Sequence, residues 1–178
     1  MTVLVYGGAA SGKSEYAETL ILNGQENPRI YLATMEPFGE EGRARIERHR
    51  KLRENKGFVT LERCTSLSSL HVPRGSAVLL EDLGNLCANE LFSPEGAGSG
   101  RVLGEILSGI ENLAQQAGRL VIVSNDIFSG AGQYEGEMAQ YLCLMGTLHQ
   151  IIAEIASTVV EVVCGIPIFH KGGTPCAN

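Results

Sequence analysis

The chain has 178 residues, of which 44% are hydrophobic, and a formal net charge of −6 at pH 7. This length allows one α/β domain with a sizeable core, and the composition is that of an ordinary globular protein, which excludes a disordered chain. The acidic balance argues against general nucleic-acid binding through a basic surface.

Short apolar runs alternate with helical patterns along the chain. Several runs are continuously apolar, which is typical of strands covered on both faces of a parallel sheet. We expect strands at Val3–Tyr6, Ile30–Ala33, Phe58–Leu61, Ala77–Glu81, Leu120–Ser124 and Thr158–Cys164. We expect helices at Gly12–Leu22, Glu41–Glu54, Leu83–Leu91, Val102–Gln116 and Glu137–Ala156. The alternation predicts a layered α/β fold with right-handed crossovers.

One low-complexity stretch, Ser93–Gly100, interrupts this pattern. Both a domain linker and a flexible surface loop fit its composition. Too little chain lies on either side for two good cores, so we expect a loop within a single nucleotide-binding domain of residues 1–178.

Cysteines stand at positions 64, 87, 143, 164 and 176. Their odd number and wide spacing, without a CxxC pair, favour reduced thiols that act as small buried hydrophobic residues. The N-terminus shows no signal-peptide pattern, and no apolar run approaches the roughly 20 residues of a membrane span. We therefore expect a cytoplasmic protein.

A glycine-rich motif joins the first expected strand to the first expected helix. It consists of Gly7, Gly8, Ala9, Ala10, Ser11, Gly12, Lys13 and Ser14. Its glycines allow backbone N–H groups to converge on phosphate oxygens at a helix N-terminus. Lys13 would neutralise the β- and γ-phosphates, and the Ser14 hydroxyl would bind Mg²⁺. The motif predicts a P-loop site for a nucleoside triphosphate.

Such a loop needs a carboxylate at the end of a neighbouring strand to organise Mg²⁺. Glu81 and Asp82, at the end of the expected strand Ala77–Glu81, both supply one. Either acid can serve, directly or through water. Asp82 can instead simply start the helix that follows, so Glu81 is the better candidate.

A basic segment stands out in this acidic chain, because six of its 14 lysine and arginine residues lie between Arg43 and Arg53. On a helix, Arg45, His49 and Arg53 share one face. A histidine among arginines tends to stay neutral and can act as a nucleophile, and guanidinium groups can hold a polyphosphate. Taken alone, the residues favour a solvated basic helix without a catalytic histidine.

Motifs spread over nearly the whole chain resemble one enzyme family. They are the opening Leu-Val-Tyr-Gly-Gly-Ala-Ala-Ser-Gly-Lys-Ser, Tyr31–Thr34, Arg45–Arg50, Thr60–Glu62, Leu79–Leu83 with Asn89, Val123–Asn125 and Gly165–Pro167. This ordered set is similar to the bifunctional adenosylcobinamide kinase/adenosylcobinamide-phosphate guanylyltransferase family. The resemblance implies a P-loop NTPase-type (RecA-like) fold with a mostly parallel sheet flanked by helices.

The resemblance also implies an enzyme that assembles the nucleotide loop in cobalamin biosynthesis. The family phosphorylates the aminopropanol hydroxyl of adenosylcobinamide, with ATP or GTP as donor. It then transfers GMP from GTP to adenosylcobinamide phosphate through a guanylylated histidine, which by resemblance is His49, and gives adenosylcobinamide-GDP. Attack by a histidine on the α-phosphorus forms a labile N–P bond, expels pyrophosphate and divides one transfer into two easier steps.

The family's nucleotide contacts can be carried over residue by residue. They fall on Gly7 to Ser14, Ala33, Thr34, Met35, Arg50, Lys51, Leu52, Arg53, Glu62 and Glu81. Glu62 suits guanine chemically, because a carboxylate can accept hydrogen bonds from N1–H and the N2 amino group. Without the resemblance, an exposed strand-end acid is the simpler interpretation of Glu62. The resemblance further implies a homotrimer with nucleotide sites near subunit boundaries.

The chain departs from the family pattern in two places. Ala10 stands where the family commonly has an arginine. After Asn125, a charged family pattern is replaced by Gln140-Tyr141-Leu142-Cys143, Gly146 and His149-Gln150. Because His49 and Glu62 persist, guanylyl transfer is better supported than phosphorylation.

Two alternatives stay open on sequence alone. One is a P-loop kinase for another small alcohol, without guanylyl transfer, which leaves the basic segment unexplained. The other is a nucleotide-dependent switch or regulatory binding module, which the apolar replacements at Leu142 and Cys143 keep open.

Overall fold

The computed structural model describes residues 1–36, 40, 47, 56–128 and 134–173. In this part of the chain, one sheet contains the strands β1 (Thr2–Gly7), β2 (Arg29–Ala33), β3 (Phe58–Glu62), β4 (Ala77–Glu81), β5 (Arg119–Asn125), β6 (Thr158–Val163) and β7 (Ile166–Lys171). Their order is β3-β2-β4-β5-β1-β6-β7, and every neighbouring pair is parallel except β6 with β7. The mostly parallel sheet is confirmed.

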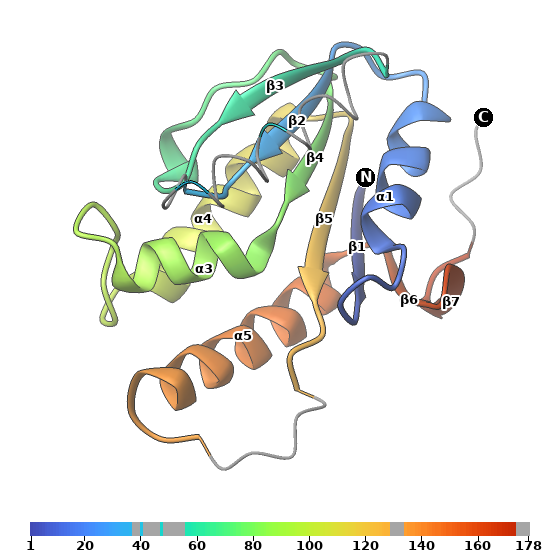
Figure 1. Ribbon diagram of the computed structural model, residues 1–178. Coiled ribbons are helices and arrows are strands. Elements are labelled where there is room, and N and C mark those ends of the chain that lie inside the picture. The colour runs from blue at the N-terminus through green and yellow to red at the C-terminus, as the bar shows by residue number, and fades with distance from the viewer. Residues whose placement is uncertain (37–39, 41–46, 48–55, 129–133, 174–178) are drawn as a thin grey trace.

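Helices cover both faces of this sheet (Figure 1). The helix α1 (Lys13–Leu22) packs on one face, and α3 (Leu83–Phe92), α4 (Val102–Gln116) and α5 (Gly136–Ile155) pack on the other. Along β1, Val3 and Val5 belong to the core beneath α1, whereas Leu4 belongs to the opposite core. The central strands are apolar throughout because both of their faces are buried.

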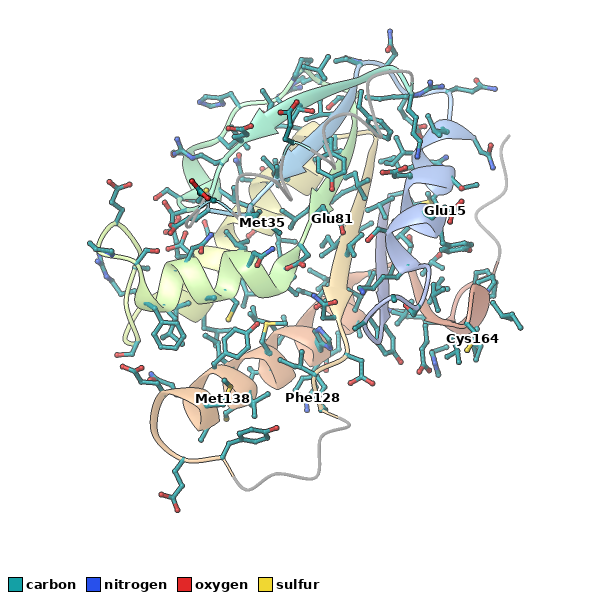
Figure 2. All side chains as sticks on the ribbon, in the orientation of Figure 1. Glu15, Met35, Glu81, Phe128, Met138 and Cys164 are labelled. Carbon is teal, nitrogen blue, oxygen red and sulfur yellow. The ribbon has the colours of Figure 1, made fainter. Side chains whose placement is uncertain are left out.

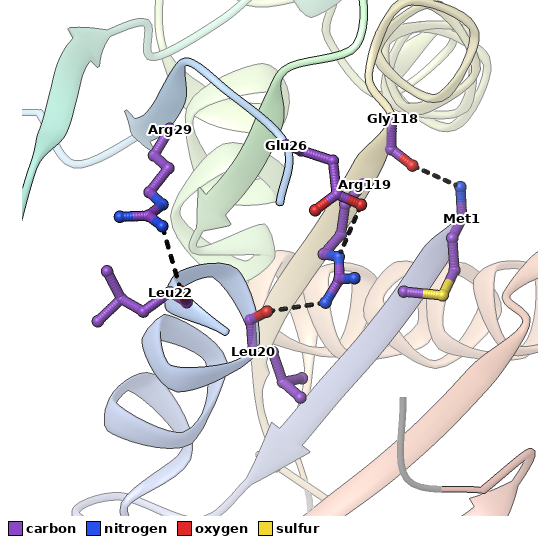
Figure 3. A network of polar contacts seen from close by, with 7 residues as sticks. All are labelled: Met1, Leu20, Leu22, Glu26, Arg29, Gly118 and Arg119. Carbon is purple, nitrogen blue, oxygen red and sulfur yellow. Dashed lines mark hydrogen bonds and ion pairs between the residues drawn. The ribbon is translucent and has the colours of Figure 1, made fainter. Parts of the chain in front are cut away.

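Buried Arg119 anchors the C-terminal end of α1 to the sheet (Figure 3). Its guanidinium donates to the carbonyl of Leu20 at 2.9 Å and to Glu26 at 3.2 Å. Beside it, Arg29 donates to the carbonyl of Leu22 at 3.2 Å, and the terminal amine of Met1 donates to Gly118 at 3.0 Å. The bonds from Arg119 and Arg29 fix the C-terminal end of α1, and with it the loop at the other end of the helix.

All six expected strands are present, and so are the expected helices that correspond to α1, α3, α4 and α5. The expected helix Glu41–Glu54 lies outside the described residues, apart from Glu47. Two elements were not predicted: the short 3-10 helix Leu67–Ser69 and the antiparallel strand β7. β7 follows a tight turn in which Cys164 and Gly165 both have positive φ, of 50° and 80°, as a type I′ hairpin requires.

Strands of the one sheet lie on both sides of Ser93–Gly100, so this segment is a loop and does not link two separate sheets. Glu90, only 1% exposed, holds it in place. The Glu90 carboxylate accepts from the backbone N–H of Ala97 at 2.9 Å and of Ser66 at 2.6 Å. The N–H of Gly98 donates to the Glu90 carbonyl at 2.8 Å. The loop is therefore anchored to α3 and to the segment that follows β3.

Cysteine burial differs from the expectation. Cys87 is buried and Cys64 is half-buried, but Cys143 and Cys164 are exposed. The interpretation as buried hydrophobic residues is therefore wrong for Cys143 and Cys164, which lie on the outer side of α5 and in the β6–β7 turn. All four are free thiols, as predicted.

We predict that Glu90→Gln destabilises the fold by about 1–3 kcal/mol, because an amide N–H would then face a backbone N–H in a buried site. The measurement is urea unfolding followed by circular dichroism. Glu111→Gln, at an exposed acid on α4, is the matched control and should stay within about 0.5 kcal/mol of wild type. Equal stability of the two variants would contradict the anchoring role of Glu90.

His149 lies half-buried between α5 and β5. Its Nε2 is hydrogen-bonded to the fully buried Ser124 hydroxyl at 2.7 Å. The rings of Tyr6 and Phe128 have their centroids 5.9 and 5.4 Å from the imidazole. Burial lowers the pKa of His149, and the nearby charge of Asp126 opposes this only in part.

A lowered pKa in the folded state makes stability depend on pH. The contribution of His149 is fully present above the ordinary histidine pKa of about 6.5 and is lost as pH falls toward the folded-state value, at up to about 1.4 kcal/mol per pH unit. We predict that His149→Gln loses less stability than wild type between neutral pH and pH 5. Urea unfolding across this range measures it, with His71→Gln, at an exposed histidine, as control. If the unfolding free energies of wild type and His149→Gln changed with pH in parallel, His149 would not be the source of the pH dependence.

Candidate functional site

The glycine-rich loop connects the end of β1 to the first turn of α1 (Figure 1). Gly12 caps α1 with a φ of 90°, in the left-handed region that glycine adopts without steric cost. A Cβ on Gly7 would lie 2.5 Å from the carbonyl oxygen of Val162, so the chain can pass there only as glycine. The Lys13 ammonium donates to the Gly8 carbonyl at 3.1 Å and thus lies over the loop.

Two backbone contacts hold the loop from outside. The N–H of Gly165, in the β6–β7 turn, donates to the carbonyl of Ser11 at 2.8 Å. The N–H of Asp126, just after β5, donates to the carbonyl of Gly7 at 2.9 Å. The loop is therefore braced by the hairpin and by the strand beside β1.

Glu81, at the end of β4, faces the first turn of α1. The Ser14 hydroxyl donates to Glu81 Oε1 at 2.6 Å. Glu81 Oε2 is buried and has no hydrogen-bond partner among the described residues. Burial raises the pKa of Glu81 to about 7; Asp82 adds to this increase, while the Ser14 bond and Lys13 oppose it. An inaccessible carboxylate oxygen beside a serine hydroxyl suits a divalent cation, which would stabilise the charged carboxylate.

Asp82 has a different setting from Glu81. Its Oδ1 accepts from the N–H of Asn85 at 2.7 Å, so it caps α3, as the simpler interpretation of this residue predicted. Its Oδ2 accepts from the side-chain amide of Asn125, the last residue of β5, at 3.1 Å. Since β5 lies between β1 and β4, this bond fixes Asp82 next to the loop.

These side chains surround a cavity of about 390 Å³. Its lining brings together six of the eight predicted loop residues, both predicted acids and Asn125, but not Gly7 or Gly8. The full set is Ala9, Ala10, Ser11, Gly12, Lys13, Ser14, Glu15, Glu81, Asp82 and Asn125. In Figure 2, Glu81 lies centrally, at the end of β4 that faces this cavity. The volume is within the range of small-molecule sites.

Predicted nucleotide contacts also lie beyond the cavity, on the same edge of the sheet. Ala33 is in register with Glu62 on one side and with Glu81 on the other. Glu62 is exposed and Met35 is half-buried. The side chain of Thr34 is fully buried; its hydroxyl donates to the Asp82 carbonyl at 2.8 Å and accepts from the Asp82 N–H at 2.9 Å.

Asn89 links the segments that follow β2 and β3. Its side-chain amide, on α3, donates to the carbonyl of Thr34 at 2.7 Å and to that of Cys64 at 3.2 Å. It therefore holds the segments after β2 and β3 together. Asn89 and Asn125 belong to the sequence motifs described above, but the motifs alone give neither residue a role. For Asn125 a usable signal was its place at a strand end, whereas nothing local identified the partners of Asn89.

Ala10 lines a second hollow of about 320 Å³ on the other side of the loop, together with the acidic residues Asp126 and Glu161. The remaining predicted site residues, His49 and Arg50 to Arg53, lie outside the described residues. Within the described part of the chain, no group of three or more histidine, cysteine or acidic side chains could hold a metal. No helix there is long and apolar enough to cross a membrane.

Comparison with known proteins agrees with this geometry. A family model described as "Cobinamide kinase / cobinamide phosphate guanyltransferase" matches residues 3–169. The Escherichia coli K12 protein named bifunctional adenosylcobalamin biosynthesis protein CobU is 32% identical over 184 residues, with 96% of this chain and all of that protein covered. The corresponding protein of Pseudomonas aeruginosa PAO1, CobP, is 33% identical, with 97% and 98% covered.

Solved structures show the same fold at low sequence identity. A protein of Pyrococcus horikoshii OT3, Project ID PH0250, has a TM-score of 0.53 and 12% identity, over 98% of this chain and 87% of that one. An ATPase from the type III secretion system of pathogenic bacteria has a TM-score of 0.50 and 11% identity, over 98% and 59%. With the family match over nearly its whole length, the chain belongs to the cobinamide kinase / cobinamide phosphate guanyltransferase family.

Proposed function

We propose that this chain phosphorylates adenosylcobinamide with ATP or GTP and transfers GMP from GTP to adenosylcobinamide phosphate. The observation that carries the proposal is the Ser14–Glu81 pair beneath a complete phosphate loop, with the unpartnered Glu81 Oε2 beside it, in a chain of this family. A cavity built in this way suits the binding and transfer of phosphate groups.

The loop would hold the triphosphate through its backbone N–H groups and the N-terminus of α1. Lys13, which donates to the Gly8 carbonyl in this structure, can turn to the β- and γ-phosphates. Ser14 and Glu81 would hold Mg²⁺, with Asp82 able to contribute through water. When bound, Mg²⁺ would offset the charge of the phosphate oxygens.

In the kinase step, the aminopropanol hydroxyl attacks the γ-phosphorus and gives up its proton to water, the bond to the bridging β-phosphate oxygen breaks, and the nucleoside diphosphate leaves. Lys13 and the loop N–H groups stabilise the charge that develops on the leaving oxygens. Asn125 retains a second amide hydrogen beside the one that it donates to Asp82. This second hydrogen can be donated to the γ-phosphate and hold it beside Glu81 and Asp82.

In the guanylyl step, neutral His49 attacks the α-phosphorus of GTP and pyrophosphate leaves. The phosphate of adenosylcobinamide phosphate then displaces the histidine and receives GMP. Glu62 would accept from the guanine base, and Arg50 to Arg53 would contact the nucleotide. The register that aligns Glu62, Ala33 and Glu81 on adjacent strands supports a nucleotide lying along this edge.

The remaining expectations belong to the same proposal. Residues 1–178 act as one nucleotide-binding and transferase domain, which the single sheet of the described residues supports. By its likeness to the family, the enzyme is a cytoplasmic homotrimer. The net charge of −6 supports small-molecule substrates over nucleic acid.

GTP labelled at the α-phosphate tests the histidine mechanism. We expect wild-type protein with Mg²⁺ to become covalently labelled, His49→Ala to lose the label, and His71→Ala to keep it. A chase with adenosylcobinamide phosphate should move the label to the corrinoid. A small-alcohol kinase or a regulatory module would give no label, and unlabelled wild-type protein that still turns over the corrinoid would rule out the histidine intermediate.

Asn125→Ala tests the phosphate-orienting role. Loss of one hydrogen bond to a charged group should lower kcat of the kinase step about 10- to 100-fold, with KM for the nucleotide within about threefold. Steady-state kinetics at saturating adenosylcobinamide provide the measurement. Gln150→Ala, at an exposed amide on α5, is the control. A raised KM with unchanged kcat would show that Asn125 serves binding alone.

A further inference from the structure

A patch of exposed aromatic and methionine side chains lies where α3 and α5 come together. We define the α3–α5 face by Phe92, Phe128, Met138 and Tyr141. Phe92, Phe128 and Met138 are 47%, 46% and 50% exposed, and Tyr141 is half-buried. In Figure 2, Met138 and Phe128 lie along α5, on the side of the molecule below Glu81.

The members of this face are held in place by neighbours. The ring centroids of Phe92 and Tyr141 are 6.5 Å apart. Met138 precedes Tyr141 by three residues on α5, so the two side chains share one side of the helix. Phe128 packs against His149, with ring centroids 5.4 Å apart. From Met138 to His149, at the rise of an α-helix, the face extends over about 16 Å.

The α3–α5 face begins beside the cavity lined by the glycine-rich loop, Glu81, Asp82 and Asn125, which we call the phosphate cavity. The Tyr141 hydroxyl donates to the carbonyl of Gly84 at 3.2 Å, two residues after Asp82. A Cβ on Gly84 would lie 3.1 Å from the Tyr141 hydroxyl and 3.3 Å from Asp82 Oδ1. Phe128 follows Asn125, which lines the cavity, by three residues. Asp82 and Asn125 thus separate the bound phosphates from the apolar surface.

Two directions out of the cavity are already assigned. The loop and α1 enclose the side of the phosphates, and the proposed nucleoside position follows the strand ends from Glu81 to Ala33 and Glu62. The acceptor must nevertheless bring a hydroxyl to the γ-phosphorus. Among the described residues, a third direction passes over Asp82 and Asn125 onto the α3–α5 face, and it suits the acceptor.

We propose that the α3–α5 face binds the corrin ring, while the aminopropanol arm reaches over Asp82 and Asn125 into the phosphate cavity. This inference rests on the proposed function, and it assigns a location to the corrinoid on the protein. Cobinamide fits this division, because its acceptor hydroxyl sits on a short flexible arm at the edge of a broad macrocycle.

The chemistry of the surface matches that of the ring. The conjugated corrin ring has apolar faces inside its border of amide side chains, and aromatic and thioether side chains make favourable dispersion contacts with such faces. The alkylcobalt(III) corrinoid carries a net positive charge. Residues 120–170, which include α5, contain no lysine or arginine, and Glu135 and Glu137 are exposed at the start of the helix. A cation is therefore attracted here, and aromatic faces add to that attraction.

Equilibrium dialysis of adenosylcobinamide, kept in the dark and followed by its visible absorbance, tests the proposal. We compare wild type with Phe92→Ala, Met138→Ala and the double variant. Val59→Ala and Ile155→Ala are matched controls, since these apolar side chains are 54% and 59% exposed elsewhere. Melting temperature and sedimentation equilibrium verify the fold and the subunit number of every variant.

We expect the double variant to raise Kd for adenosylcobinamide at least about tenfold, and the controls to change it less than about twofold. Met138→Lys should weaken binding more than Met138→Glu, by a factor that shrinks as salt is added. These results would support the corrin site.

Other outcomes would overturn it. A double variant that binds adenosylcobinamide as wild type does, in a preparation whose wild-type protein phosphorylates the corrinoid, would refute the α3–α5 face and leave the proposed function standing. A changed subunit number with an unchanged Kd would instead make this face a contact between copies of the chain. Wild-type protein that neither binds nor phosphorylates the corrinoid would refute the proposed function and the corrin site together.

Discussion

The hydrogen bond from Ser14 to Glu81 joins two segments that lie 67 residues apart in the chain. It forms because α1 starts directly beneath the end of β4, and this placement depends on the order of the strands. β5 lies between β1 and β4, so α1 packs across β5 to reach β4. The same order brings Asn125, the last residue of β5, between the loop and Asp82. The phosphate cavity, the acids and the amide are therefore consequences of one sheet topology.

A second set of hydrogen bonds links the C-terminal ends of β4, β2 and β3. The N–H of Thr34 donates to the Glu81 carbonyl at 3.1 Å, and its hydroxyl exchanges two hydrogen bonds with the backbone of Asp82. Asn89 then ties the Thr34 carbonyl to that of Cys64, just beyond Glu62. Because these groups are paired and buried or half-buried, moving one strand end would leave polar atoms unsatisfied at the next. The strand ends that carry the proposed nucleotide contacts thus behave as one rigid row.

Sequence patterns predicted the parts of the molecule that local chemistry determines. Continuous apolar runs indicated the parallel strands, and the glycine-rich motif indicated both the loop and the need for an acid such as Glu81. Contacts between distant segments had no local signal, as the bond from Asn125 to Asp82, the Asn89 bridge and the Ser124–His149 pair show. The strand β7 was missed because Cys164-Gly165 is not a common turn pair and Pro167 argues against a strand, although an edge position tolerates proline. The proposed role of His49 came from the resemblance alone, since its own neighbours favour a solvated helix.

The charges are distributed unevenly along the chain, which bears on the two proposed substrates. The cations suited to phosphate are concentrated in Lys13 and in the segment from Arg43 to Arg53, whereas residues 120–170 contain none. Ala10 extends this separation, because an arginine there would adjoin the hollow that Asp126 and Glu161 line. In the proposed function, Lys13 would attract the triphosphate, and the lack of lysine and arginine on α5 would favour a positively charged corrinoid there. With the corrin on the α3–α5 face, as proposed, the acceptor hydroxyl would reach the γ-phosphate by passing Asp82 and Asn125.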